Sequence, residues 1–143
     1  MFIQKGTSHY NTFHRYNRDA NQFYNLEFDA VEEVECRRLD GFDIDTSGQV
    51  LLKIDTQGHE VAVLEGAGDI LNCVDVALVE TSFAVEYEGL DPSFPMVVEL
   101  LRRHDLYPII FQEFGRGISN YAFERDVVFA KRDLLNNILF ASD

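Results

Sequence analysis

The sequence contains only two cysteines, Cys36 and Cys73, among its 143 residues. The two are far apart, and neither belongs to a Cys-x-x-Cys pair or to a Cys/His cluster. Structural zinc sites and disulfide frameworks need such groupings, so neither is indicated. We expect two buried thiols in a protein of the reducing cytosol.

Long apolar runs are also missing. No run approaches the roughly 18 to 20 apolar residues that cross a bilayer. The N-terminal stretch MFIQKGTSHYNTFHRY lacks the apolar core of a signal peptide. The sequence therefore predicts neither a transmembrane nor a classically secreted protein, and we expect a cytoplasmic one.

Basic residues are scarce, since 12 Lys and Arg face 25 Asp and Glu for a formal net charge of -13. The densest basic patches are the pairs Arg37-Arg38 and Arg102-Arg103, and acids flank both. Such a chain repels phosphate backbones, so we expect neither nucleic acid nor a membrane as a partner. An uncharged or cationic small molecule suits this charge better.

Hydrophobic residues make up 46% of the chain, which is enough for one core. Residues 1–25 are polar and aromatic without a sustained period, and we interpret them as an irregular arm that precedes one α/β domain at 26–143. Partial alternation over Leu26 to Leu39 predicts an extended strand at the start of that domain.

Two units of strand followed by helix come next. The first has an apolar strand at Val50–Asp55, a turn at Thr56–Gly58 and a helix with apolar residues every three or four positions. The second has a strand at Val74–Glu80 and a helix that begins near Asp91-Pro92-Ser93. This alternation predicts a parallel α/β sheet.

The C-terminal part does not continue this alternation of strand and helix. Tyr107–Phe111 and Asp126–Ala130 are strand-like, and the Gly-containing loop between them leaves no room for a crossover helix. They should therefore pair as an antiparallel hairpin. Residues Leu134–Phe140 are expected to form a short closing helix, or an exposed apolar tail if a partner is missing.

Two acids stand at the carboxyl ends of the predicted strands, where ligands collect in parallel sheets. Asp55 ends the first core strand and Glu80 the second, so the two carboxylates could face one cleft. Together they could hold a metal, orient a hydroxyl or act as a general base. The alternative is structural, with each acid capping a helix or accepting backbone N–H bonds.

The turn after the first core strand offers fewer candidates. Gly58 permits a close turn before a helix, whose N-terminus favours an anion or carboxylate, and Glu60 suits the same dipole in a structural role. His59 lacks the second histidine of a His-Glu-x-x-His zinc site, so we expect no metal ligand and interpret it as a surface or supporting residue. A metal-dependent hydrolase using Asp55, Glu80 and His59 is a minor alternative.

Several motifs together resemble the FkbM family of S-adenosylmethionine-dependent methyltransferases. The most specific is LLKIDTQGHEVAVLEGA from Leu51 to Ala67, and the order and spacing of the flanking motifs agree with it. The resemblance covers roughly Val34 to Arg132. The flanking motifs are Arg38-Leu39-Asp40, Val79-Glu80, Tyr87-Glu88-Gly89 and Asp126-Val127-Val128-Phe129.

The resemblance implies a partial Rossmann-like sheet, in which the two units and the hairpin are the fourth to seventh strands. It implies transfer of a methyl group from S-adenosylmethionine to a hydroxyl of a sugar, glycolipid or secondary metabolite. The resemblance implies that Asp55 is the first candidate for a catalytic residue, and that Gln57 and Glu80 are lesser candidates. It also implies that Asp55 and Gly58 bind the cofactor, and that Asp40 is an acid near the cofactor.

One part of the family pattern is missing. No strand with a glycine-rich turn that opens a helix precedes these motifs, so the chain resembles the C-terminal half of a methyltransferase. The edge of the strand at Val50–Asp55 would then be unpaired. We expect it to be covered by the segment Leu26–Cys36, by a second copy of the chain or by a separate N-terminal half. A non-catalytic remnant that acts as an association module is the alternative function.

Overall fold

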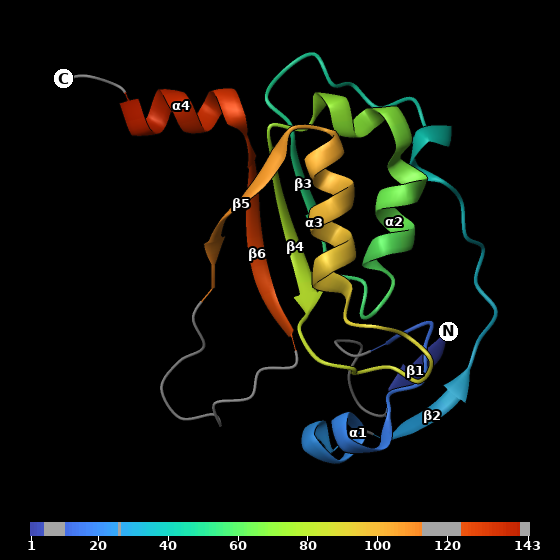
Figure 1. Ribbon diagram of the computed structural model, residues 1–143. Helices are drawn as coiled ribbons and strands as arrows, with labels where there is room; N and C mark the ends of the chain where they lie inside the picture. The colour runs from blue at the N-terminus through green and yellow to red at the C-terminus, as the bar shows by residue number, and fades with distance from the viewer. Residues whose placement is uncertain (5–10, 26, 113–123, 141–143) are drawn as a thin grey trace.

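Two separate sheets organise the computed structural model, which describes residues 1–4, 11–25, 27–112 and 124–140. The larger sheet has the order β3-β4-β6-β5, and the smaller pairs β1 with β2. Figure 1 shows the larger sheet at the centre of the molecule, with β1 and β2 at the end toward which β4 points. The strand bounds are β1 Phe2–Gln4, β2 Phe28–Val31, β3 Leu51–Ile54, β4 Val76–Ser82, β5 Leu106–Phe111 and β6 Glu124–Lys131.

The larger sheet is mixed. β3 and β4 are parallel, whereas β6 lies between β4 and β5 and runs antiparallel to both. The predicted parallel unit and the predicted C-terminal hairpin are therefore confirmed. The loop residues 113–123 of that hairpin lie outside the described residues.

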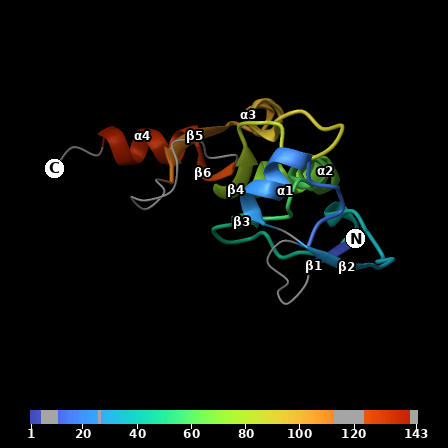
Figure 2. The ribbon, with the colours of Figure 1, turned by 90° about the horizontal axis from the view of Figure 1, so that it is seen from below.

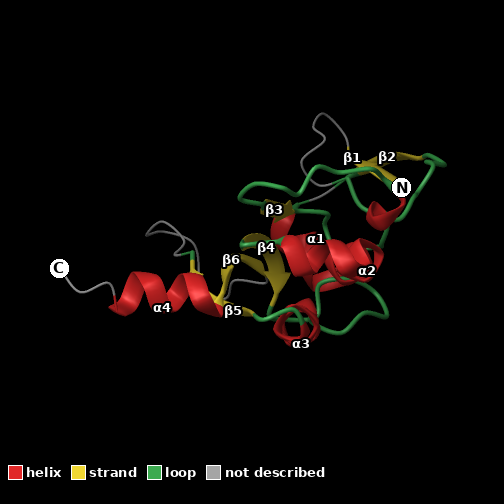
Figure 3. Ribbon diagram, turned by 90° about the horizontal axis from the view of Figure 1, so that it is seen from above, coloured by secondary structure: helices red, strands yellow, loops and turns green. Residues whose placement is uncertain are grey.

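Helices α2 (Glu60–Ala67) and α3 (Ser93–Arg103) make the two crossovers and pack on the same face of the sheet (Figures 1 and 3). Their core-facing residues are three or four positions apart, Leu64 and Ala67 in α2 and Val97 and Leu101 in α3, and all four are buried. Full burial of the leucine and valine side chains contributes about 1.5 to 3 kcal/mol each, and burial of the Ala67 methyl group contributes less. These contacts hold the turn before α2 against the sheet.

The segment Leu26–Leu39 was predicted to be one strand, but only β2 forms. β2 pairs antiparallel with β1 in the small sheet, so it does not cover the outer edge of β3. After β2 the chain is exposed and acidic through Glu32, Glu33 and Glu35, and it has no apolar face to bury.

Residues 1–25, predicted to be irregular, contain β1 and the helix α1 (Arg18–Tyr24). Asn17 caps this helix, since its side chain accepts a hydrogen bond from the N–H of Ala20 at 2.8 Å. Seen from below in Figure 2, α1 lies over the end of the larger sheet near β4 and α2, and β1 and β2 lie together to one side of that sheet. The N-terminal segment is therefore part of the folded body.

Other expectations concern the surface. The predicted closing helix is α4 (Arg132–Phe140), which extends away from the sheet in Figures 1 and 3.

Cys36 and Cys73 are both exposed, so the expectation of buried thiols is wrong. Cys36 lies in the acidic segment after β2, and Cys73 ends the short 3-10 helix η2 (Gly68–Cys73). Among the described residues, no helix has the length and apolar character needed to span a membrane.

Candidate functional site

The carboxyl ends of β3 and β4 bring together the two acids proposed from the sequence. The parallel register places Ile54 opposite Val79, so Asp55 follows β3 at the level of Glu80 in β4. The Asp55 side chain is 41% exposed, whereas Glu80 is largely buried. One of the two carboxyl groups therefore faces solvent and the other faces the protein.

The two acids differ in protonation. Burial, together with the negative charges of Glu124 and Asp55, raises the pKa of Glu80 to about 9. For Asp55, burial acts against ionisation, but hydrogen bonds from Lys53 and Gln57 outweigh it and lower the pKa below its usual value. The Lys53 Nζ atom lies 2.7 Å from Asp55 Oδ2. At neutral pH the pair therefore consists of a protonated Glu80 beside an ionised Asp55.

Gln57 connects these acids to the N-terminal segment. Its side-chain Nε2 donates to Glu80 Oε2 at 2.6 Å and to Asp55 Oδ1 at 3.3 Å, and its Oε1 accepts from the Tyr16 hydroxyl at 2.8 Å. Gln57 is 6% exposed and has a φ of 51°, an uncommon conformation for a residue other than glycine. These bonds hold the amide in one orientation.

Gly58 allows the close approach of an aromatic ring. Its φ is 93°, and a Cβ built on it would lie 2.6 Å from a ring carbon of Tyr87. Next to it, Glu60 Oε1 accepts from the N–H groups of Gly58 and Thr56 at 3.0 and 3.2 Å. This agrees with the structural role expected for Glu60. Gly58 faces Tyr87 where the resemblance had placed the cofactor.

Three residues of the N-terminal segment close over this turn. Thr12 Oγ1 donates to the backbone oxygen of Gln57 at 2.6 Å, and His14 Nε2 lies 3.2 Å from His59 Nδ1. Tyr16 completes the set through Gln57, and the Tyr87 hydroxyl donates to the Tyr16 hydroxyl at 3.2 Å. None of these contacts was predicted. Each joins residues more than 40 positions apart, and the sequence has no local pattern that signals them.

Asp40 is not brought into this group. It lies in the short 3-10 helix η1 (Leu39–Gly41), where its carboxylate forms an ion pair with Arg38 at 2.6 Å and approaches Gly68. Gly68 follows the last residue of α2, whereas Asp55 and Gly58 precede the first. Asp40 and Asp55 therefore lie at opposite ends of that helix.

The arrangement does not support a metal-dependent hydrolase. No group of three His, Cys, Asp or Glu side chains has metal-binding geometry within the parts of the chain that the structure describes. His59 instead contacts the Phe13 ring, at 4.8 Å between centroids, and the His14 ring. The acids and Gln57 are suited to orienting a hydroxyl by hydrogen bonds and to accepting its proton.

Comparison with known proteins identifies a family. The family model for the methyltransferase FkbM domain matches residues 2–106. No curated protein and no solved structure matches the chain. The match begins further toward the N-terminus than the resemblance in the motifs did, and it includes Thr12, His14 and Tyr16.

Proposed function

Because the chain belongs to the FkbM methyltransferase family, we propose that it takes part in methyl transfer from S-adenosylmethionine to a hydroxyl group of a sugar, glycolipid or secondary metabolite. The acceptor hydroxyl binds at the carboxyl ends of β3 and β4. The observation that carries the proposal is the Asp55–Gln57–Glu80 cluster at that position.

The strand order supports the family fold implied by the motifs. In the order β3-β4-β6-β5 the penultimate strand is antiparallel to its neighbours. We propose that these strands correspond to the fourth to seventh strands of a Rossmann-like methyltransferase sheet. In open α/β sheets, ligands bind beyond the carboxyl ends of the strands, which is where the cluster lies.

Each member of the cluster has a distinct role in this proposal. Ionised Asp55 accepts a hydrogen bond from the acceptor hydroxyl and takes up its proton when the oxygen is methylated. Gln57 fixes the direction of the Asp55 carboxylate through its Nε2. Glu80, being protonated, shares a hydrogen bond with Asp55 and adds no second negative charge at neutral pH.

The described residues beside Gly58 do not fit the cofactor. The space lined by Gly58, Glu80 and Tyr87 is too small for a water-sized sphere, and the Tyr87 ring lies directly against Gly58. Within the described part of the chain, the geometry beside Gly58 therefore assigns no donor position, and the roles above concern the acceptor alone. S-adenosylmethionine is proposed from family membership.

The same filled space favours a second candidate function, a non-catalytic association module. In that case Tyr16, Tyr87 and Gln57 form a permanent core where other family members bind ligand, and the outer edge of β3 serves contact with another chain. Titration of S-adenosylhomocysteine into the full chain by calorimetry separates the two functions.

The proposed function predicts micromolar binding of S-adenosylhomocysteine, and Asp55→Asn should leave this affinity nearly unchanged while it lowers the rate of methyl transfer to the acceptor at least about tenfold, a change of about 1.4 kcal/mol. Asp43→Asn is the matched control, because Asp43 is exposed in the loop before β3. Absence of binding by a folded sample rejects the methyltransferase proposal for this chain and favours the association module. A rate of methyl transfer that Asp55→Asn leaves unchanged rejects the assigned site.

A further inference from the structure

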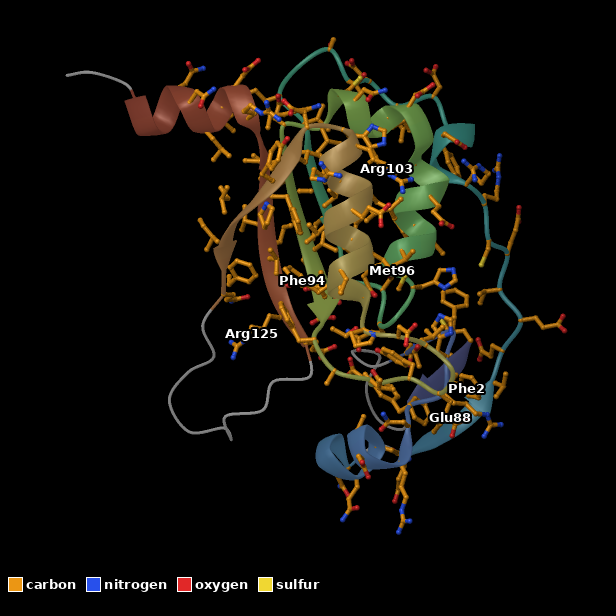
Figure 4. All side chains as sticks on the ribbon, in the orientation of Figure 1. Phe2, Glu88, Phe94, Met96, Arg103 and Arg125 are labelled. Atoms are coloured by element: carbon orange, nitrogen blue, oxygen red, sulfur yellow. The ribbon has the colours of Figure 1, made fainter. Side chains whose placement is uncertain are left out.

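One cavity is lined in part by Tyr16, whose hydroxyl donates to Gln57 of the acid cluster. Its volume is about 460 Å³, and it is formed by β1, β2, α1 and the loop after β4. Phe2 and Glu88, labelled in Figure 4, lie together at this end of the molecule. The residues that determine its chemistry are Phe2, Arg15, Tyr16, Asn21, Phe28 and Glu88. None of them belongs to the sites predicted from the sequence.

Aromatic rings make the apolar part of the wall. Tyr16 and Phe28 are stacked, with centroids 6.0 Å apart and an interplanar angle of 18°, and Phe2 meets Phe28 edge to face at 6.1 Å. The Tyr16 hydroxyl donates to Gln57. A ligand in the cavity therefore meets flat carbon surfaces on one side.

Hydrogen-bonding groups make the remainder. The Arg15 guanidinium lies over the Phe2 ring, 5.1 Å from its centroid, and the Glu88 N–H donates to the Arg15 backbone oxygen at 2.8 Å. Within the described residues, neither Arg15 nor Glu88 forms an ion pair. The Arg15 guanidinium offers hydrogen-bond donors to a ligand, the Glu88 carboxylate offers acceptors, and the Asn21 amide offers both.

The charges restrict the class of ligand. Arg15 disfavours a cation, whereas Glu88 and the net charge of -13 disfavour an anion. A neutral ligand with several hydroxyls and one apolar face can pack on the aromatic rings and form hydrogen bonds with the polar groups. A cavity of this size is in the range of small-ligand sites.

We propose that this cavity binds a neutral saccharide. Its ring packs on Phe2 and Phe28, beside the edge of the buried Tyr16, and its hydroxyls pair with Arg15, Asn21 and Glu88. Tyr16 also contacts Gln57, so the cavity adjoins the acid cluster. The further role of the saccharide as the part of the acceptor that is recognised, but not methylated, rests on the proposed function.

Binding is tested on the full chain by saturation-transfer NMR and by titration followed by chemical shifts. The probes are methyl β-D-glucopyranoside and methyl β-D-galactopyranoside, with inorganic phosphate and choline as charged comparisons. We expect at least one glycoside to bind with a dissociation constant near about 1 mM. Arg15→Ala and Glu88→Gln should each weaken it at least about fivefold. Arg18→Ala and Glu33→Gln are matched controls outside the cavity.

The outcomes separate this proposal from the proposed function. Binding of neither glycoside, tighter binding of phosphate or choline, or glycoside binding that Arg15→Ala and Glu88→Gln leave unchanged would overturn the saccharide site. Because the measurement needs no methyl donor, glycoside binding in a chain that fails to bind S-adenosylhomocysteine supports the cavity and rejects only its role in methyl transfer.

Discussion

Gly58 places the backbone directly against an aromatic ring in the turn between β3 and α2. A methyl group added there would lie 2.6 Å from the Tyr87 ring at a φ of 93°. Gly58→Ala should lower the free energy of unfolding by about 2 to 4 kcal/mol, because backbone strain and a steric clash add. Urea unfolding followed by circular dichroism measures this difference.

Gly89→Ala is the matched control. Gly89 also has a positive φ, 75°, but no atom lies within 4 Å of its added Cβ. It should show the backbone cost alone, about 1 kcal/mol. Equal losses in the two variants would show that contact with Tyr87 contributes nothing.

The protonated Glu80 gives the site a pH dependence. Its pKa is raised from 4.5 to about 9 in the folded chain, so the folded state holds the proton more tightly than the unfolded state. The corresponding stability is fully present below about pH 4.5 and is lost as pH rises toward 9. Glu80→Gln mimics the protonated acid and should remove this loss.

Unfolding measured at about pH 6 and about pH 8 tests the prediction. Between these two pH values, the free energy of unfolding of the wild-type chain should fall by about 1 to 2 kcal/mol more than that of Glu80→Gln. Glu33→Gln, at an exposed position after β2, should follow the wild type. The same change in the free energy of unfolding for the wild type and for Glu80→Gln would contradict a protonated Glu80.

At the scale of elements, the segment from Thr12 to Tyr16 is fixed on the β3–α2 turn through the His14–His59 contact. Burial and the neighbouring His59 lower the pKa of His14 below 6.5. A lowered histidine pKa means that its contribution to stability is present above about pH 6.5 and is lost as pH falls. Hydrogen-exchange protection of residues 12–16 should therefore decrease from about pH 7.5 to about pH 5.5.

His14→Gln removes the titration and keeps a hydrogen-bonding side chain, so protection in this variant should change little with pH. His104→Gln is the control, because His104 contacts Asn72 away from the site. A pH dependence in His14→Gln equal to that of the wild type would assign the effect to another group.

The elements that follow from local sequence were predicted correctly. β3, α2, β4 and α3 have continuous apolar periods and turn residues at their ends, and local pattern alone identifies them. The cluster of Asp55 and Glu80 followed from the same reasoning, since parallel strands bring their carboxyl ends to one edge.

The N-terminal contacts could not be predicted in this way. β1 has three residues and pairs with β2 from about 25 positions away, so its own sequence has too few residues to show a period. Tyr16 and His14 reach the site only through tertiary packing on Gln57 and His59. The Arg38–Asp40 ion pair, which draws Asp40 toward the far end of α2, is likewise a property of the fold.

At the scale of the whole molecule, β3 is an edge strand of the larger sheet within the described residues. The backbone oxygen of Val50 accepts from the N–H groups of Asp75 and Val76, next to β4. Because backbone groups alternate sides along a strand, the N–H of Leu51 points outward. Leu51 is 68% exposed, and this edge is available to pair with another strand.

We expect a second copy of the chain to pair along this edge, and Leu51→Pro to prevent it. Proline removes the outward N–H but no hydrogen bond to β4, and an edge strand tolerates it. Light scattering at micromolar concentration should show a dimer for the wild type and a monomer for Leu51→Pro, with circular dichroism confirming the fold of the variant.

Leu51→Ala separates the two contributions to the contact, because it removes the exposed side chain and keeps the N–H. A dimer in Leu51→Ala assigns pairing to the backbone, whereas a strictly monomeric wild type, or a dimer that survives Leu51→Pro, contradicts pairing between copies through β3.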